Sequence, residues 1–246
     1  DVIDLLQQAA ARPAAAADAP PFPAAAAADP LVRDEEVEVH AGPVRLAGRL
    51  TVPEQPIGTV VFAHGSGSSR QSPRNRFVAT VLNQARLATL LFDLLAPSEE
   101  RDRANVFDIE LLAARLVDVT AWLRTQREVE ELAVGYFGAS TGAAAALVAA
   151  AEPGTDVAAV VSRGGRPDLA ERRLAQVYAP TLLIVGGRDD VVLALNRQAQ
   201  AQIPGESRVA VVPGATHLFE EPGALAAVAE LARQWFVGHL APRVHH

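Results

Sequence analysis

The chain has 246 residues, of which 22 are basic and 29 are acidic, so its formal net charge at pH 7 is −7. This acidic balance argues against nucleic acid as a partner. The chain contains no cysteine, which excludes disulfides, thiolate zinc sites and cysteine nucleophiles. All its basic residues are arginine, so a Schiff-base lysine and a Walker-type phosphate loop are excluded as well. No apolar run reaches the roughly 18 residues that a membrane helix needs, so we expect no membrane partner.

The first part of the chain differs in composition from the rest. Thirteen of the first 30 residues are Ala and five are Pro, and the prolines interrupt any regular element. We therefore predict that residues 1–34 form an N-terminal arm or linker and that residues 35–242 form one folded domain. The arm either has no function or packs on the domain, on an upstream domain or on a second copy of the chain. We predict no secretory signal and a cytoplasmic location, because no basic stretch precedes an apolar one.

Regular patterning begins after the arm. The segments 36–40 and 44–50 alternate between apolar and polar residues and predict an antiparallel hairpin. Short apolar runs then alternate with helical segments. We expect strands at 59–63, 88–92, 132–137, 157–161, 181–185 and 208–212, and helices at 74–87, 105–127, 140–152, 168–176, 193–202 and 221–240.

Continuous apolar runs are typical of strands that are buried on both faces of a parallel sheet. The fold class is therefore α/β: a mostly parallel central sheet with helices on both faces and an antiparallel N-terminal hairpin. In the helix expected at 105–127, apolar residues recur at helical spacing, and Asn105 is the expected N-cap.

The segment Gly138-Ala139-Ser140-Thr141-Gly142 lies between a predicted strand and a predicted helix. In this context G-x-S-x-G is typical of a sharp turn that presents a serine hydroxyl above the carboxyl end of a sheet. The N-terminal dipole of the following helix favours developing negative charge at the same place. We predict Ser140 as a nucleophile; the alternative is a serine that only caps its helix.

A serine hydroxyl needs a base that takes its proton, and the base needs a carboxylate that orients it. His217 follows the last predicted strand, and Asp189 and Asp190 follow the strand at 181–185. We choose His217 as the base and Asp189 as the acid. Asp190 stays the alternative acid; otherwise it is solvated or caps the next helix. The chain order serine, aspartate, histidine is that of α/β-hydrolases.

The tetrahedral intermediate of acyl transfer carries an oxyanion that needs hydrogen-bond donors. We assign this role to the backbone N–H groups of Thr141, directly after the nucleophile, and of Ser66, in the Gly- and Ser-rich loop after the first parallel strand. Gly65 lets this loop approach the substrate closely. His64 is a substrate-binding candidate too, although holding the loop is the role that we favour for it.

Four arginines follow strands at the same edge of the sheet, and we select Arg163 among them as a substrate-binding candidate. Guanidinium groups at this edge could recognise a carboxylate on the substrate. We favour the alternative, in which they pair with acids of neighbouring loops. The four residues are Arg74, Arg76, Arg163 and Arg166.

These residues together resemble the dienelactone hydrolase-like branch of the α/β-hydrolase superfamily, over about residues 35–240. The sequence segments on which the resemblance rests are 64–70, 72–76, 91–95, 135–142 and 162–168. It is similar to a bacterial subgroup that occurs fused behind a phosphoribosyltransferase domain. Residues 1–10 resemble the last helix of that upstream domain. No phosphoribosyl-binding loop is present, so the resemblance implies no transferase activity. Dienelactone hydrolases proper use a cysteine nucleophile; with Ser140 in its place, the resemblance implies a general carboxylesterase.

We expect a serine hydrolase that cleaves carboxylic esters of small or medium size through an acyl-enzyme intermediate, without metal or organic cofactor. Two other functions stay open: an acyltransferase that uses the same triad, and a non-catalytic binding domain with the same fold. Caps in this superfamily often follow the sixth strand. The segment 162–180 is too short for a large cap domain, so we expect an open site.

Overall fold

The computed structural model describes residues 31–242; residues 1–30 and 243–246 lie outside the described part, and with them most of the predicted arm. Strand β1 (Leu31–Ala41) already includes residues 31–34, so the predicted start of the folded domain at residue 35 is too late. Asp34 accepts hydrogen bonds from Arg49 and Thr51 on β2 (Val44–Pro53). The sequence indicates a strand only through its alternation of apolar and polar residues. Cross-strand contacts such as these extend β1 beyond that alternating segment.

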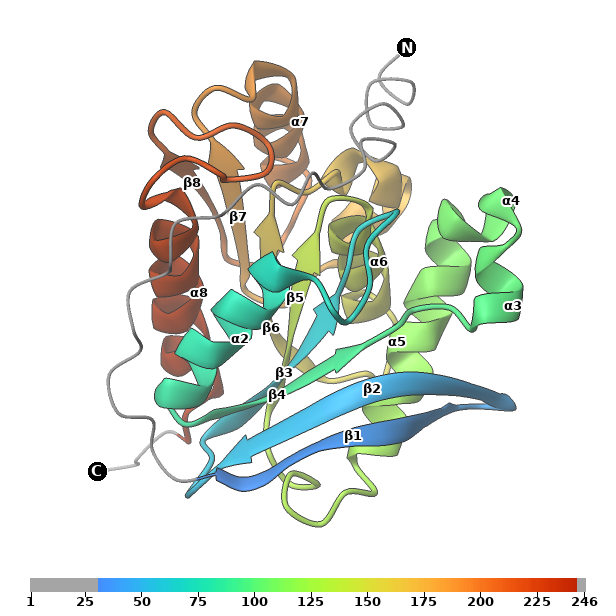
Figure 1. The fold of residues 1–246 in the computed structure, drawn as a ribbon. Coiled ribbons are helices and arrows are strands. Elements are labelled where there is room, and N and C mark those ends of the chain that lie inside the picture. Colours follow the sequence, from blue (N-terminus) through green and yellow to red (C-terminus); the bar gives the residue numbers. More distant parts are fainter. Residues whose placement is uncertain (1–30, 243–246) are drawn as a thin grey trace.

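Eight strands form one sheet in the order β1-β2-β4-β3-β5-β6-β7-β8 (Figure 1). The pairs β1–β2 and β2–β4 are antiparallel, and the other neighbours are parallel. The predicted fold class is therefore confirmed. The remaining strands are β3 (Gly58–Ala63), β4 (Leu87–Phe92), β5 (Val134–Ala139), β6 (Val157–Arg163), β7 (Thr181–Gly186) and β8 (Ser207–Val212).

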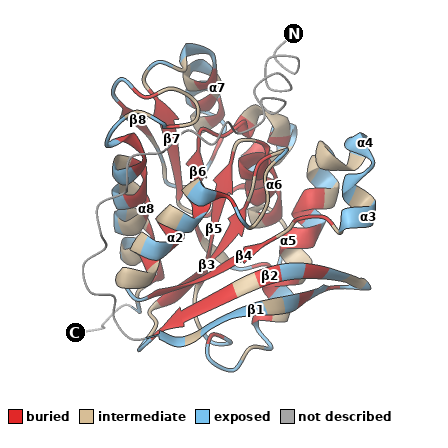
Figure 2. Ribbon diagram, in the orientation of Figure 1, coloured by how far each residue is buried: buried red, intermediate tan, exposed pale blue. Residues whose placement is uncertain are grey.

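Helices cover both faces of the sheet. One face packs against α2 (Pro73–Gln84) and α8 (Ala224–Leu240), and the other against α5 (Ile109–Leu123), α6 (Thr141–Ala150) and α7 (Asp190–Gln200). Figure 2 shows β3, β4, β5 and β7 buried along their length and β1 largely exposed, which is the difference between a continuous apolar run and an alternating one. None of the helices in residues 31–242 is long and apolar enough to cross a membrane.

Short helical segments lie in two connections. The segments α3 (Pro97–Glu100) and α4 (Arg103–Val106) precede α5, and the 3₁₀ segment η1 (Pro167–Gln176) joins β6 to β7. The helix predicted at 105–127 is thus divided. Asp108 caps α5 by accepting a hydrogen bond from Leu111 N–H (3.0 Å), whereas Asn105 lies inside α4 and donates to the carbonyl of Glu99 (2.9 Å). The predicted cap at Asn105 is wrong because both residue types favour the N-cap and the sequence does not choose between them.

The strand order reverses direction beside β3. From β3 the chain passes through α2 to β4 on one side, and from β4 it returns through α5 to β5 on the other side. Because crossover connections are right-handed, α2 and α5 cover opposite faces. After β5 the chain continues into α6, which lies on the same face as α5. The segments that leave the carboxyl ends of β3 and β5 therefore run to opposite faces, and open α/β sheets bind ligands at such a point.

Candidate active site

Ser140 forms the turn between β5 and α6, at this point of the sheet. Its φ of 52° and ψ of −121° are a strained conformation that costs a residue with a side chain roughly 1–3 kcal/mol. The N–H of Ser140 donates to the carbonyl oxygen of Arg163 on β6 (3.2 Å), which holds the turn against the sheet. Strain of this kind is retained where the turn has a function.

The two glycines of the motif are sterically required. A Cβ atom on Gly138 would lie 2.4 Å from Cα of Ala143, and one on Gly142 would lie 2.2 Å from the carbonyl oxygen of Ala63. Both distances are far inside van der Waals contact, so a side chain at either position would push the helix off the sheet. The G-x-S-x-G turn thus has the close packing for which its glycines are needed.

Asp189 and His217 come from the neighbouring loops after β7 and β8. Nδ1 of His217 lies 2.7 Å from Oδ2 of Asp189, and the two side chains are 24% and 15% exposed. Asp189 occupies the N-cap position of α7 but makes no capping hydrogen bond, so its carboxylate is free to bind the imidazole. This contact makes Nδ1 the donor and leaves Nε2 as the basic nitrogen.

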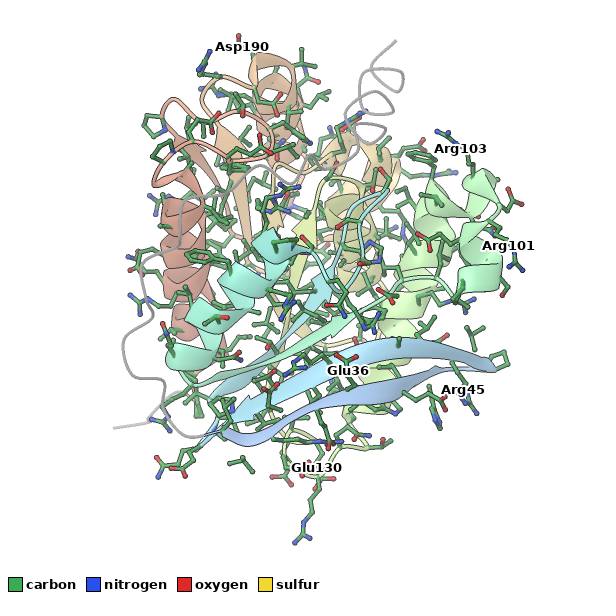
Figure 3. All side chains as sticks on the ribbon, in the orientation of Figure 1. Glu36, Arg45, Arg101, Arg103, Glu130 and Asp190 are labelled. Carbon is green, nitrogen blue, oxygen red and sulfur yellow. The ribbon has the colours of Figure 1, made fainter. Side chains whose placement is uncertain are left out.

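Asp190, the alternative acid, is the first residue of α7 and is exposed. Figure 3 shows it at the outer edge of the molecule, at the top of the view. The helix dipole favours its charge in the first turn. The structure therefore brings Asp189 to His217, and not Asp190.

The loops that carry the Asp–His pair are joined through their backbones. The N–H of Arg188 donates to the carbonyl of Ala215 (2.9 Å), and a Cβ atom on Gly186 would lie 2.4 Å from the same oxygen. The N–H of Thr216 donates to Oε1 of Glu221 (3.0 Å), and this hydrogen bond lowers the pKa of Glu221. An ionised Glu221 thus orients the residue that precedes His217.

Gly164 lies next to the imidazole and directly after the residue that binds the turn of the nucleophile. A Cβ atom on Gly164 would lie 3.6 Å from Cε1 of His217, the ring carbon next to Nε2. Gly164 follows Arg163, whose carbonyl accepts the N–H of Ser140. Within residues 31–242, the imidazole is hydrogen-bonded to Asp189 and not to Oγ of Ser140; in enzymes without substrate such bonds are often long and tighten on binding.

The loop after β3 passes directly over the nucleophile. A Cβ atom on Gly65 would lie 3.2 Å from Cβ of Ser140, so glycine permits this close approach. The N–H of Ser66, a predicted oxyanion donor, donates to Oγ1 of Thr141 (2.9 Å). The N–H of Thr141 lies in the first turn of α6, where no helical acceptor exists. The structure brings both predicted donors to Ser140, but one of them already binds a side chain.

Comparisons with known proteins agree with this arrangement. A family model described as "Alpha/beta hydrolase domain" matches residues 56–230, a range that contains the turn of Ser140, the loop over it and the Asp–His pair. The chain is a member of this α/β-hydrolase family. The solved dienelactone hydrolase from Anabaena variabilis is 57% identical, with a TM-score of 0.82, over 85% of this chain and 98% of that one. The predicted dienelactone hydrolase-like relationship is thus confirmed.

Two further comparisons concern the length of the chain and its fold. The chain is 72% identical over 215 residues to a protein of Mycobacterium tuberculosis (strain H37Rv) named "Putative phosphoribosyl transferase". The match covers 87% of this chain and 48% of that protein, so the chain spans about half the length of this relative. A dienelactone hydrolase-like promiscuous phosphotriesterase from metagenomic libraries shares the fold at 18% identity, with a TM-score of 0.70 over 85% of this chain and 99% of that one.

His64 uses both ring nitrogens to hold its loop. Nδ1 lies 2.9 Å from the carbonyl oxygen of Gly65, and Nε2 lies 3.1 Å from the N–H of Leu94. A backbone N–H can only donate, so Nε2 is unprotonated and Nδ1 carries the proton. Desolvation lowers the pKa of His64 and favours this neutral form. No group of three or more His, Asp or Glu side chains that could hold a metal occurs between residues 31 and 242.

Arg163, whose carbonyl binds the N–H of Ser140, has no acidic partner within residues 31–242. Its side chain is buried and donates from Nη2 to Oδ1 of Asn75 on α2 (3.2 Å), while Nε has no partner among the described residues. Burial and the nearby charge of Arg74 lower its pKa. Arg166, by contrast, binds Asp168 through two hydrogen bonds of 2.8 and 2.6 Å. The predicted pairing with loop acids is confirmed for Arg166 and is wrong for Arg163.

The sequence analysis missed Asn75, Glu221 and the Thr141 hydroxyl. One signal was present: Ser72 and Pro73 are typical of the start of a helix, and Ser72 does accept the N–H of Asn75 (3.3 Å). The partners of Asn75 and of the Thr141 hydroxyl come from β6 and from the loop after β3, whereas Glu221 binds a backbone N–H of its own loop. The first two partners therefore follow from the strand order, which no local pattern reveals.

Proposed function

We propose that this α/β-hydrolase is a serine hydrolase that cleaves carboxylic esters of small or medium size through an acyl-enzyme intermediate. The observation that carries the proposal is the 2.7 Å contact of His217 with Asp189, at the edge of the sheet where the strained turn of Ser140 lies. A nucleophile, a base and an acid that orients the base form the set that acyl transfer needs.

Each residue has one role in the proposed reaction. Oγ of Ser140 attacks the ester carbonyl carbon while Nε2 of His217 takes the hydroxyl proton. The bond to the leaving alcohol then breaks, and His217 gives the proton to the alcohol oxygen. Water, activated by His217, attacks the acyl carbon and releases the acid and free Ser140. Asp189 stays ionised and stabilises the imidazolium.

A cavity beside the loop over the nucleophile supports a small substrate. Its volume is about 70 Å³, and Gly65 and Ser66 line it together with Leu95, Val106 and Leu112. Pockets for drug-sized ligands have roughly 300–1,000 Å³. A cavity of this size, with a lining that also includes His64, Asp93 and Glu100, suits a short acyl or alkoxy chain.

Hydrolysis of p-nitrophenyl esters with acyl chains from C2 to C12 tests the proposal. We expect the highest kcat/KM at about C2–C4 and a decline for longer chains, because the cavity limits the chain length. Formation of an acylated acceptor when an alcohol or thiol is added, in place of free acid, would favour the acyltransferase. An absence of turnover with every ester and every acceptor would contradict the proposal and favour the binding domain.

We further propose that Arg163 recognises an anionic group on the ester. A buried guanidinium keeps its charge, and a buried charge is costly unless it is paired. In the described part of the chain the Arg163 side chain has one acceptor, the neutral Oδ1 of Asn75, so an arriving carboxylate would supply the missing partner. The carbonyl of the same residue binds the N–H of Ser140, and this closeness to the nucleophile supports such a subsite.

The Arg163→Met variant tests this recognition with two esters of equal chain length, the mono-p-nitrophenyl ester of succinic acid and p-nitrophenyl butyrate. We expect the ratio of their kcat/KM values to fall roughly 10- to 100-fold, since a hydrogen bond to a charged group contributes about 1.5–3 kcal/mol. The matched control is Arg76→Met, because Arg76 is exposed. An unchanged ratio in Arg163→Met would remove the recognition role.

A further inference from the structure

One donor in the candidate active site is occupied in a way that changes its expected role. The N–H of Ser66 donates to Oγ1 of Thr141 at 2.9 Å and so joins the loop after β3 to the first residue of α6. The same N–H is the expected second donor to the oxyanion. A direct contact of Ser66 N–H with the oxyanion would have to compete with this hydrogen bond.

The hydroxyl of Thr141 has a proton left to donate. A threonine hydroxyl carries one donor hydrogen and two acceptor lone pairs, and here one lone pair accepts the N–H of Ser66. The hydroxyl donates to no acceptor among the described residues. Thr141 is only 1% exposed, so bulk water competes little for the proton.

The two donors of Thr141 lie next to the reacting atom. Thr141 follows Ser140 directly, and its N–H is in the first turn of α6, where it has no helical acceptor. Its hydroxyl accepts the N–H of Ser66, the residue after Gly65, whose added Cβ would lie 3.2 Å from Cβ of Ser140. Both donors therefore border the place where an oxygen on the acylated carbon of Ser140 would lie.

We propose that the side chain of Thr141 is a catalytic donor. Its O–H and its backbone N–H both donate to the oxyanion, while its Oγ1 accepts the N–H of Ser66. No proton is transferred; the hydroxyl only donates a hydrogen bond while negative charge grows on the carbonyl oxygen. The bond that the hydroxyl accepts polarises its O–H and strengthens it as a donor. This inference rests on the proposed ester hydrolysis through Ser140.

Thr141→Val is the decisive variant, because valine keeps the shape of threonine and removes the hydroxyl. We expect kcat to fall roughly 100-fold with KM changed less than about threefold, as for other lost oxyanion donors. Thr141→Ser keeps the hydroxyl and should retain kcat within about fivefold of the unmodified protein, since the donor remains in place. Thr59→Val is the matched control: Thr59 on β3 is fully buried, and its hydroxyl has no partner in the described part of the chain.

A boronic acid inhibitor gives a second readout that fold defects alone would not produce. Its tetrahedral adduct with Ser140 places an oxygen in the oxyanion site, so its affinity should fall in Thr141→Val by about the same factor as kcat. Thr141→Ala is the second variant if valine prevents folding, and we expect the same two losses from it. Melting temperatures show which variants are folded.

Three results would overturn the proposal. Full kcat in Thr141→Val would return the oxyanion role to the N–H of Ser66, while loss of activity in Ser140→Ala would still support the proposed function. An equal loss in Thr141→Ser and Thr141→Val would show that shape, and not the hydroxyl, matters. An unmodified protein that neither hydrolyses esters nor binds the boronic acid would remove this inference and the proposed function together.

Discussion

Ser140→Ala is expected to lower kcat for the best p-nitrophenyl ester by roughly 10⁵–10⁶-fold, the loss that follows when the nucleophile of a serine triad is removed. The remaining rate would come from binding and from the oxyanion donors alone. KM should change little, because the hydroxyl forms its new bond only as the reaction begins. Steady-state kinetics with active-site titration of the unmodified protein measures both parameters.

Ser162→Ala is the control for this substitution. Ser162 lies on β6 next to Arg163, is fully buried, and its hydroxyl has no partner among residues 31–242. It matches Ser140 in chemistry and lies on the strand next to β5, without a place in the proposed reaction, and we expect an activity close to that of the unmodified protein. If Ser140→Ala kept its activity, another nucleophile would be at work and the serine mechanism would be wrong.

Asp189→Asn is the second substitution with a large expected effect, a loss in kcat of about 10⁴-fold. An amide in place of the carboxylate presents an N–H to Nδ1 of His217 and favours the tautomer in which Nε2 carries the proton, so the base can no longer accept one. The 2.7 Å contact makes this substitution specific for the imidazole. The pH profile of kcat/KM, measured beside kcat, reports whether the base is affected.

Asp190→Asn tests the neighbouring carboxylate with the same chemical change. Asp190 is exposed at the start of α7 (Figure 3), and surface substitutions of this kind usually change stability by less than about 0.5 kcal/mol. We expect a kcat within about twofold of the unmodified value. A larger loss in Asp190→Asn than in Asp189→Asn would reverse the assignment of the acid.

The sequence allowed most of the fold to be predicted, because the signals for its strands are local. Continuous apolar runs predicted the six parallel-type strands, and alternation predicted the hairpin. The predictions of element boundaries are wrong where two nearby residues are equally good helix caps, or where contacts with a partner strand set the end of a strand. Asn105 and Asp108 are both good caps, and β1 extends to Leu31 through contacts with β2. The role of the arm toward an upstream domain or a second copy, and the cytoplasmic location, stay predictions.

The sequence by itself determined the chemistry of the candidate nucleophile. The turn of Ser140 needs residues without a side chain at two positions close to it in the sequence. Gly138 and Gly142 occupy these positions. The fold class could also be predicted from the sequence, because the hydrophobic effect favours burial of a run of apolar residues whatever its neighbours are.

Only the tertiary structure decided which side chains meet. The sequence predicted Asp189 but left Asp190 open as the acid, and the backbone contact between the loops after β7 and β8 brings Asp189 to His217. Ser66 and Thr141 are far apart in the chain and join through a hydrogen bond because β3 and β5 are neighbours. Hydrogen bonds and ion pairs depend on distances of a few ångströms between distant segments, and the order of strands in the sheet sets those distances.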